Sequence, residues 1–345
     1  MLPCPSPLLT VMLAPVPRRI AVLAYEGCQS LDVLGPFEVF AAARHFRSAS
    51  GAPDAGYEPM LVGFDGGPVR TESGVRLTPD LTDHELLEQA PLDTLIIVGG
   101  SGVAPLVRDA DMLARVRRLA QHARRTAAVC TGAYLLAASG LLAGRRATTH
   151  WEHCDQLAAL FPDVQVVRDV IFVQDEQVWT SAGVLAGIDL ALALVEQDHG
   201  PQLVAQIARQ LVVFVRRAGG QRQLSAPLAL QASERPRMRD LAAWASEQLG
   251  ADLSLPALAK RCGMSVRSFA RAFREELGTT PARYVETLRL DSACRLLELS
   301  DKSIDEIASA CGFGSHDALG RALSRSRSLT PSAYRAQHKP RREPG

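Results

Sequence analysis

The stretch Ala259-Lys260-Arg261-Cys262-Gly263-Met264 decides how the C-terminal part of the chain is expected to fold, because its pattern returns as Ala308-Ser309-Ala310-Cys311-Gly312-Phe313. Each copy leads into an amphipathic stretch and closes with Thr-Pro and a tyrosine, first Tyr284 and then Tyr334. A short helix, a tight turn that contains glycine and a second amphipathic helix make up a helix-turn-helix motif. The sequence therefore predicts an all-α C-terminal domain with two such motifs in tandem.

The second helix of such a motif is the one that enters the DNA major groove. In the first copy, Phe269 and Phe273 lie four residues apart and predict the face that packs on the core. Arg267, Arg271 and Arg274 lie off that face. An arginine can hold a guanine through two hydrogen bonds, or it can bind a phosphate and read no sequence. Both interpretations stay open for each of the three.

The charge of the chain is unevenly distributed. Residues 235–345 carry 19 Lys and Arg against 13 Asp and Glu, a net charge of +6, whereas residues 1–234 carry 19 against 24, a net charge of −5. A basic region with helix-turn-helix patterns is typical of a DNA-binding domain. We therefore expect double-stranded DNA as the partner of the C-terminal domain and another role for the acidic N-terminal part.

The N-terminal part alternates short apolar runs with helical patterns, which predicts an α/β sandwich with a mainly parallel sheet. Residues 66–76 suggest a hairpin or an extended loop, and Arg124-Arg125 are expected on a solvated helix face. We expect strands at 20–25, 59–64, 95–98, 126–129, 164–167, 170–174 and 178–180, and helices at 36–47, 111–124 and 184–198.

The segment Ala127-Ala128-Val129-Cys130-Thr131-Gly132-Ala133-Tyr134 places Cys130 where a strand is expected to turn sharply into a helix. This is the geometry of a nucleophile elbow, which exposes a side chain above a sheet. The dipole of the following helix predicts a lowered thiol pKa. His150 follows in Thr148-Thr149-His150-Trp151, and Gly99-Gly100 ends another strand, where a backbone N–H can bind an oxyanion or a carboxylate.

The N-terminal region, about residues 18–200, resembles the PfpI-type, class I glutamine-amidotransferase-like domain, which has a flavodoxin-like fold. The region 238–336 resembles the AraC/XylS-type DNA-binding domain. Their combination is similar to the GlxA-like transcriptional regulators, as are the segments 31–36, 147–151 and 180–184. The stretch between the two regions is polar and contains glycine and proline, which predicts a linker. We therefore expect five segments: a disordered leader at 1–17, a sensor domain at 18–217, a linker at 218–237, the DNA-binding domain at 238–336 and a basic tail at 337–345.

The resemblance implies roles for individual residues of the N-terminal domain. Cys130 would be the elbow residue with His150 as its partner, and Gly100 and Thr131 would supply the anion-hole amides. Asp32 falls where enzymes of the superfamily usually carry a glutamate. The candidate catalytic residues are thus Cys130, His150 and Asp32, and the candidate ligand-binding residues are Asp32, Gly100, Cys130, Thr131, His150 and Trp151.

On the DNA-binding side, the resemblance assigns one set of groove-facing residues to each motif. The second helix of the repeat should read sequence less well than the first, because Asp317 repels phosphate and Gly320 has no side chain. The residues expected to face DNA are Arg267, Ala270, Arg271 and Arg274 in the first motif, and His316, Asp317, Gly320 and Arg321 in the second.

Two functions stay open for the N-terminal pocket. The first is that of a sensor in a dimeric, ligand-responsive transcriptional activator that works with RNA polymerase, and related regulators suggest an amino-acid-derived or quaternary-amine ligand. The alternative is an enzyme of the PfpI superfamily that uses Cys130, as an isonitrile hydratase, an amidase or a glyoxalase-like enzyme, with secondary DNA binding. We expect the sensor and not an enzyme, with residual chemistry at Cys130 left open.

Cysteine usage and the N-terminus bear on cofactors and location. The seven cysteines are scattered, with no C-x-x-C pair and no zinc-type spacing. We therefore expect no disulfide framework, no metal and no cofactor, and a reducing cytoplasm as the location. The first 19 residues contain five prolines and fit neither a signal peptide nor a membrane span.

Overall fold

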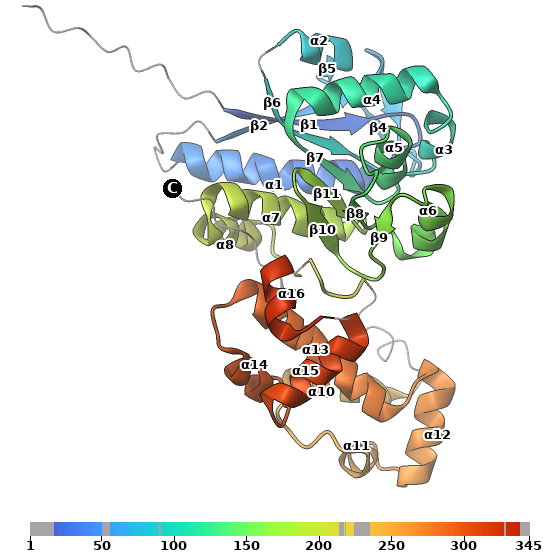
Figure 1. The fold of residues 1–345 in the computed structure, drawn as a ribbon, viewed down its shortest axis with the longest axis vertical. Coiled ribbons are helices and arrows are strands. Elements are labelled where there is room, and N and C mark those ends of the chain that lie inside the picture. The colour runs from blue at the N-terminus through green and yellow to red at the C-terminus, as the bar shows by residue number, and fades with distance from the viewer. Residues whose placement is uncertain are drawn as a thin grey trace, which may run out of the picture.

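The computed structural model of the chain describes residues 17–49, 56–89, 91–213, 217, 219–223, 235–327 and 329–338. An α/β domain is followed by an all-helical domain, and segment 219–223 runs between them (Figure 1). This confirms the fold class expected from the sequence. The expected leader, most of the tail and residues 224–234 of the expected linker lie outside the described residues, so those boundaries stay predictions.

The N-terminal domain is built on a seven-stranded sheet with the order β10-β11-β7-β6-β1-β2-β5. Adjacent strands are parallel except for the β10–β11 pair, which is antiparallel. Continuous apolar runs form the central strands because both faces of a parallel sheet are covered. The strands are β1 (Arg18–Ala24), β2 (Tyr57–Gly63), β5 (Leu81–Thr82), β6 (Leu92–Ile97), β7 (Ala123–Val129), β10 (Phe172–Asp175) and β11 (Val178–Ser181).

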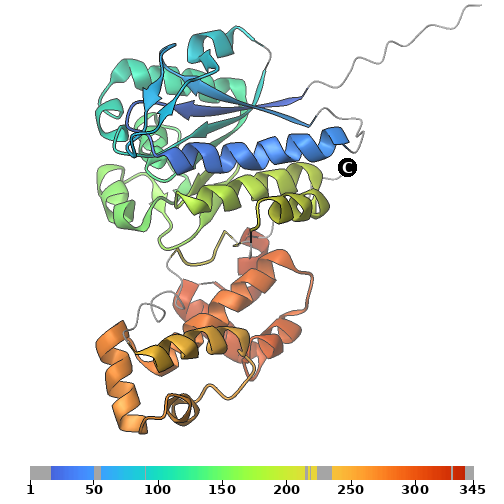
Figure 2. The same ribbon diagram turned by 180° about the vertical axis from the view of Figure 1, so that it is seen from behind.

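Helices cover both faces of this sheet. α1 (Ser30–Ala49), α7 (Leu185–His199) and α8 (Pro201–Gln210) pack together on one face, while α4 (Ala110–His122) and α5 (Gly132–Ala138) lie on the other (Figure 2). The remaining short elements are α2 (Asp83–Leu87), α3 (Val103–Leu106), α6 (Cys154–Leu160), the 3₁₀ turn η1 (Trp151–His153), the hairpin β3–β4 (Val69–Arg70 and Arg76–Leu77) and the parallel pair β8–β9 (Arg146–Ala147 and Gln165–Val166).

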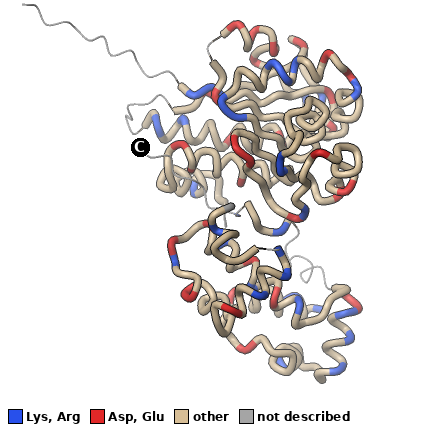
Figure 3. The backbone as a smooth tube through the Cα atoms, in the orientation of Figure 1, with Lys and Arg blue, Asp and Glu red and all other residues tan. Residues whose placement is uncertain are grey.

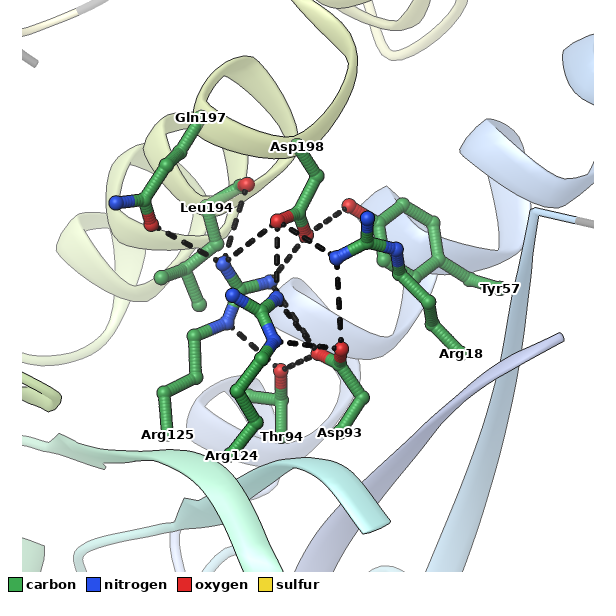
Figure 4. Close-up of polar contacts among 9 residues, drawn as sticks. All are labelled: Arg18, Tyr57, Asp93, Thr94, Arg124, Arg125, Leu194, Gln197 and Asp198. Carbon is green, nitrogen blue, oxygen red and sulfur yellow. Dashed lines mark hydrogen bonds and ion pairs between the residues drawn. The ribbon is translucent and has the colours of Figure 1, made fainter. Parts of the chain in front are cut away.

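A buried charge cluster lies at the amino-terminal edge of the sheet and corrects one expectation from the sequence. Arg124 and Arg125 belong to strand β7, not to a solvated helix face. Arg125 is only 1% exposed and forms an ion pair with Asp198 at 2.5 Å (Figure 4). Although burial would raise the pKa of Asp198, the guanidinium groups of Arg125, Arg124 and Arg18 and the hydroxyl of Tyr57 hold it below its ordinary value.

The C-terminal domain contains two small hydrophobic cores, one for each motif. Both cores take side chains from the same long helix, with Leu288 in the first and Leu290 in the second. The two predicted helix-turn-helix motifs are thus confirmed in the structure. The helices are α10 (Pro236–Glu247), α11 (Leu255–Arg261), α12 (Val266–Leu277), α13 (Pro281–Leu299), α14 (Ile304–Ala310), α15 (His316–Arg327) and α16 (Pro331–His338).

Local signals explain where these helices begin and end. Ser265 caps α12 by accepting a hydrogen bond from the amide of Ser268, and Gly278 ends it with a φ of 61°. Ser303 and Glu306 form a capping box at the start of α14. Among the described residues, no helix combines the length and the apolar composition that crossing a membrane requires.

Candidate functional site

Cys130 occupies the sharp turn between strand β7 and helix α5. Its φ of 56° is in the left-handed region, which a non-glycine residue rarely adopts. The neighbouring chain must come very close, because a Cβ at Gly183 would lie 2.3 Å from the Cβ of Cys130. The side chain of Cys130 is half-buried, as expected for an elbow residue that faces a pocket.

Asp32 lies beneath this turn and is fully buried, near the start of α1. Its two carboxylate oxygens accept hydrogen bonds from the amides of Val184, at 2.7 Å, and Gly99, at 3.0 Å. Burial raises the pKa of Asp32 to about 6, although these two hydrogen bonds lower it. The carboxylate therefore holds two loops against the elbow, and it does not line the pocket above.

The expectation of a lowered thiol pKa at Cys130 is wrong. Burial, followed by the charge of Asp32, raises this pKa to about 12, although hydrogen bonds from the amide and hydroxyl of Thr131 act in the opposite direction. Helix α5 has seven residues, so its dipole is small and is outweighed by desolvation. The thiol is thus protonated at neutral pH, which makes it a poor nucleophile.

The expected anion hole is also partly occupied by the protein itself. The amide of Gly100 donates a hydrogen bond to the hydroxyl oxygen of Thr131 at 2.9 Å. That N–H is therefore not free to stabilise an oxyanion. Thr131 directs its own amide towards the sulfur of Cys130. The hydrogen bond between Gly100 and Thr131 thus stabilises the turn at Cys130.

A pocket of about 910 Å³ opens above Cys130, at the carboxyl ends of the strands. This volume is typical of a site for a small organic molecule. Of the expected ligand-binding residues, Gly100, Cys130, Thr131 and His150 line it, whereas Asp32 and the 46%-exposed Trp151 do not. Sequence reasoning missed the other polar lining residues, which come from separate loops and helices: Gln29, Glu72, Ser101, Arg108, Tyr134, Glu152, His153 and Gln156.

His150 lines the pocket without forming a dyad with Cys130. In the described part of the chain, its Nδ1 atom is buried and has no hydrogen-bond partner. The nearest acidic atom is Oε2 of Glu152, at 3.6 Å. Burial lowers the pKa of His150, so the ring is neutral at physiological pH. Cys130, His150 and Asp32 thus lie in one region, but their hydrogen bonds do not connect them as a catalytic triad.

Hydrogen bonds lead from this pocket to the segment between the domains. The hydroxyl of Thr149 donates to the carbonyl oxygen of Cys130 at 2.8 Å. The carbonyl oxygen of Thr149 accepts from Nε2 of Gln223 at 2.9 Å. Next to it, the amide of Ile171 donates to the carbonyl oxygens of Gly219 and Gln221. Segment 219–223 is therefore attached to the pocket wall.

The same segment is attached to the C-terminal domain. The amide of Gly220 donates to the fully buried carboxylate of Glu298 on α13, at 3.2 Å, and the hydroxyl of Tyr334 donates to the same oxygen at 2.7 Å. Burial raises the pKa of Glu298 to about 7. Arg327 of α15 also reaches back to the carbonyl oxygen of Asp169. The contact between the domains thus involves the second helix-turn-helix motif.

The expected DNA-contacting residues lie on the exposed sides of α12 and α15. Phe269 and Phe273 are fully buried, as are Leu319 and Leu323 in the second motif. Lys and Arg positions are interspersed with Asp and Glu positions along the backbone of this domain (Figure 3). Arg267, Arg271, Arg274, His316, Asp317 and Arg321 are exposed, and Ala270 and Gly320 are half-buried.

Comparison with known families agrees with this division. Residues 18–197 match the DJ-1/PfpI family, and residues 258–337 match a helix-turn-helix domain. In the N-terminal match, the fold resembles the crystal structure of a THiJ/PfpI family protein from Pseudomonas syringae, with 25% identity and a TM-score of 0.52 over 71% of this chain and 93% of that one.

Curated relatives combine both parts or contain one. The HTH-type transcriptional regulator CdhR of Pseudomonas aeruginosa is 31% identical over 81% of this chain and 82% of its own length. The regulator GlxA of Rhizobium meliloti is 31% identical over 81% and 85%. An isonitrile hydratase of Pseudomonas putida is 37% identical over 56% of this chain and 77% of its own length.

Proposed function

Because this chain belongs to the DJ-1/PfpI family, and within it to the GlxA-like transcriptional regulators that carry an AraC-type helix-turn-helix domain, we propose that it is a ligand-responsive activator. A small metabolite binds in the pocket above Cys130 and changes how the C-terminal domain engages DNA.

The observation that carries this proposal is the bonded path from the pocket to the second motif. The hydroxyl of Thr149, the residue before His150, is bonded to the carbonyl oxygen of Cys130, and the carbonyl oxygen of Thr149 accepts from Gln223. Three residues before Gln223, Gly220 is bonded to Glu298 beneath Tyr334. A ligand that moves residues 149–150, which follow strand β8, shifts segment 219–223. This shift changes the contact of the segment with the second motif. Such a ligand must bind one arrangement more tightly than the other.

The pocket suits a small zwitterion, such as an amino-acid derivative. Glu72 and Glu152 can face an ammonium group, and Arg108 can face a carboxylate. Tyr134, Leu160 and Phe161 supply apolar and aromatic surface for the rest of the molecule. Asp32 was the expected partner of the ammonium group, but it is buried below the pocket, so Glu72 takes this role in the proposal.

We include a homodimer through the N-terminal domain and recruitment of RNA polymerase in the proposal. Support for the dimer comes from three exposed leucines near the starts of the packed helices α1 and α7, with exposed fractions of 47% for Leu31, 39% for Leu34 and 59% for Leu185. Apolar surface of this kind is typical of an interface. Leu34→Glu should shift the purified protein towards a monomer in light scattering, whereas Leu160→Glu on α6 should leave its mass unchanged.

The second candidate function is an enzyme of this superfamily, and the similarity to an isonitrile hydratase favours it. Two features weigh against it. The pKa of Cys130 is raised to about 12, and the amide of Gly100 is already bonded to Thr131. Both features lower the capacity for nucleophilic catalysis.

A footprint of the purified full chain on the promoter next to its own gene tests the regulator, with and without amino acids and amines. We expect protection of a specific site whose extent or affinity changes with one ligand. The Cys130→Ala variant separates the two functions: a sensor keeps its ligand response, whereas an enzyme loses all turnover of an isonitrile or amide. Turnover by the wild type that this variant abolishes, with no ligand effect on DNA, would reject the sensor.

A further inference from the structure

Three metal-ligating side chains converge on one wall of the pocket, outside the Cys130 turn. They are His150, Glu152 and His153, at the junction between β8 and α6. One ligand atom from each lies within 4.8 Å of the other two. The amide of His153 donates to the carbonyl oxygen of His150 at 2.8 Å, which closes a 3₁₀ turn. Residues three apart in such a turn lie on the same side, so the two imidazoles face the same space.

The distance between His150 and Glu152 is compatible with binding of one shared metal ion. Nδ1 of His150 and Oε2 of Glu152 are 3.6 Å apart, too far for a hydrogen bond. Two ligand atoms that bind one tetrahedral zinc ion at about 2.0–2.2 Å lie roughly 3.4 Å from each other. The same Nδ1 atom is buried and has no hydrogen-bond partner in the described part of the chain. A metal ion would provide the missing partner.

The chemistry of the three groups also selects a class of ion. Imidazole nitrogen suits zinc, copper, iron and nickel, whereas magnesium and calcium prefer sites made of oxygen. Two histidines and a carboxylate leave a coordination position open, as in catalytic and ligand-binding zinc sites.

We infer that His150, Glu152 and His153 form a mononuclear site for a divalent transition-metal ion of the zinc class, with its open position facing the pocket. All three residues line the pocket that Cys130 lines. A ligand in this pocket would then have a Lewis acid available for a carboxylate or an amine nitrogen. No metal site is predicted from the sequence, because the spacing of His150, Glu152 and His153 is not a familiar zinc pattern.

Metal titration of the untagged full-length protein tests this inference. The chain is stripped with a chelator and titrated with Co²⁺, whose d–d absorption bands report coordination, and Zn²⁺ is then added to displace the cobalt. We expect one equivalent per chain, bands of a nitrogen- and oxygen-ligated four- or five-coordinate ion, and a rise in melting temperature with Zn²⁺. His153→Ala and Glu152→Gln should each weaken Co²⁺ binding by at least about tenfold.

Two controls make the result decisive. His84→Ala removes an exposed histidine on α2 and should leave the titration unchanged. Cys130→Ala should also leave it unchanged, because the site has no sulfur ligand. Equal affinity in wild type, His153→Ala and Glu152→Gln would overturn the inference, and so would a sulfur-to-cobalt charge-transfer band that disappears in Cys130→Ala. Because the titration contains no DNA, its outcome is independent of the proposed regulatory function.

Discussion

The side-chain amide of Gln223 donates a hydrogen bond to the carbonyl oxygen of Thr149 at 2.9 Å, so the segment between the domains is fixed to the residue that precedes His150. The same amide group also donates to the carbonyl oxygen of Val170 at 3.0 Å. Under the proposed function, a ligand that moves the chain at His150 acts on residues 219–223 through this hydrogen bond. Gly220, the second residue of this segment, is bonded to the C-terminal domain and is a suitable place to break the connection.

Gly220→Ala should loosen the contact between the domains. A Cβ at this position would lie 1.8 Å from the hydroxyl of Tyr334 and 2.9 Å from Oε1 of Glu298, so the segment has to move away. We expect a loss of about 1–3 kcal/mol in the unfolding free energy of the C-terminal domain, measured by denaturant titration. Gly250→Ala is the matched control, because nothing lies within 4 Å of its Cβ. Equal stability of the two variants would contradict this account.

The stability of the same contact should depend on pH. The pKa of Glu298 in the folded chain is about 7, above the ordinary value of 4.5. The folded state therefore binds the proton more tightly, and stability falls as the pH rises from about 4.5 through 7. Glu298→Gln removes this titration, so the difference between wild type and variant in melting temperature should change across that range. A difference that is constant with pH would show that Glu298 keeps an ordinary pKa.

The thiol of Cys130 should react slowly with alkylating agents near neutral pH. Burial and the charge of Asp32 raise its pKa to about 12, so the alkylation rate should still be rising at pH 9. Asp32→Ala removes the negative charge and should speed alkylation of the Cys130 peptide, measured by mass spectrometry. Glu72→Gln is the graded control, with a smaller increase, because the charge of Glu72 affects the thiol less. A rate that reaches a plateau below pH 8 would mean that the thiolate is stabilised.

Asp198→Ala should destabilise the N-terminal domain by about 3–5 kcal/mol. It would leave Arg125, which is 1% exposed, as a buried charge without its closest partner (Figure 4). The unfolding transition of this domain in denaturant measures the loss. Asp155→Ala removes one side of an exposed ion pair with Arg168 and should cost at most about 1 kcal/mol. A similar small loss in both variants would argue against a structural role for the cluster.

Arg271→Ala should weaken binding to the cognate operator by about 1–3 kcal/mol and relax the preference at one base pair. The side chain is 77% exposed, and it forms an ion pair with Glu275, which is 3.8 Å away and itself exposed. Binding is measured by titration of labelled operator and random DNA. Arg44→Ala, on the other domain, should change neither. An equal loss on both DNAs would show that Arg271 contacts a phosphate.

The sequence predicted the layers of the fold well, because strand and helix periodicity is local. The helix-turn-helix repeat at Cys262 and Cys311 and the elbow at Cys130 are equally local. The boundary between α4 and β7 was missed, since no glycine or proline marks it and Arg124-Arg125 read as polar helix. Helix α8 was missed as well, although Gly200-Pro201 is a start signal.

For the site, the sequence identified residues better than their roles. Asp32 and Cys130 lie at the predicted place. The pKa of the thiol, however, depends on its burial by segments that are distant in the sequence. The dipole of α5 was visible in the sequence, and the desolvation that outweighs it was not. Glu72, His153 and Arg108 reach the pocket from three separate loops, so no local pattern could bring them together.

Helix α13 has a consequence for the DNA as well as for the protein. It supplies Leu288 to one core and Leu290 to the other, and so it fixes α12 and α15 to a common support. The two supported helices are unlike: when Phe269 is aligned with Leu319, Arg267 corresponds to Asp317 and Ala270 to Gly320. If α12 and α15 both contact one DNA duplex, the protein therefore binds it in a single orientation. Inverting the bound DNA segment within a promoter would reverse the orientation of the protein, so that the N-terminal domain would face the opposite direction along the DNA.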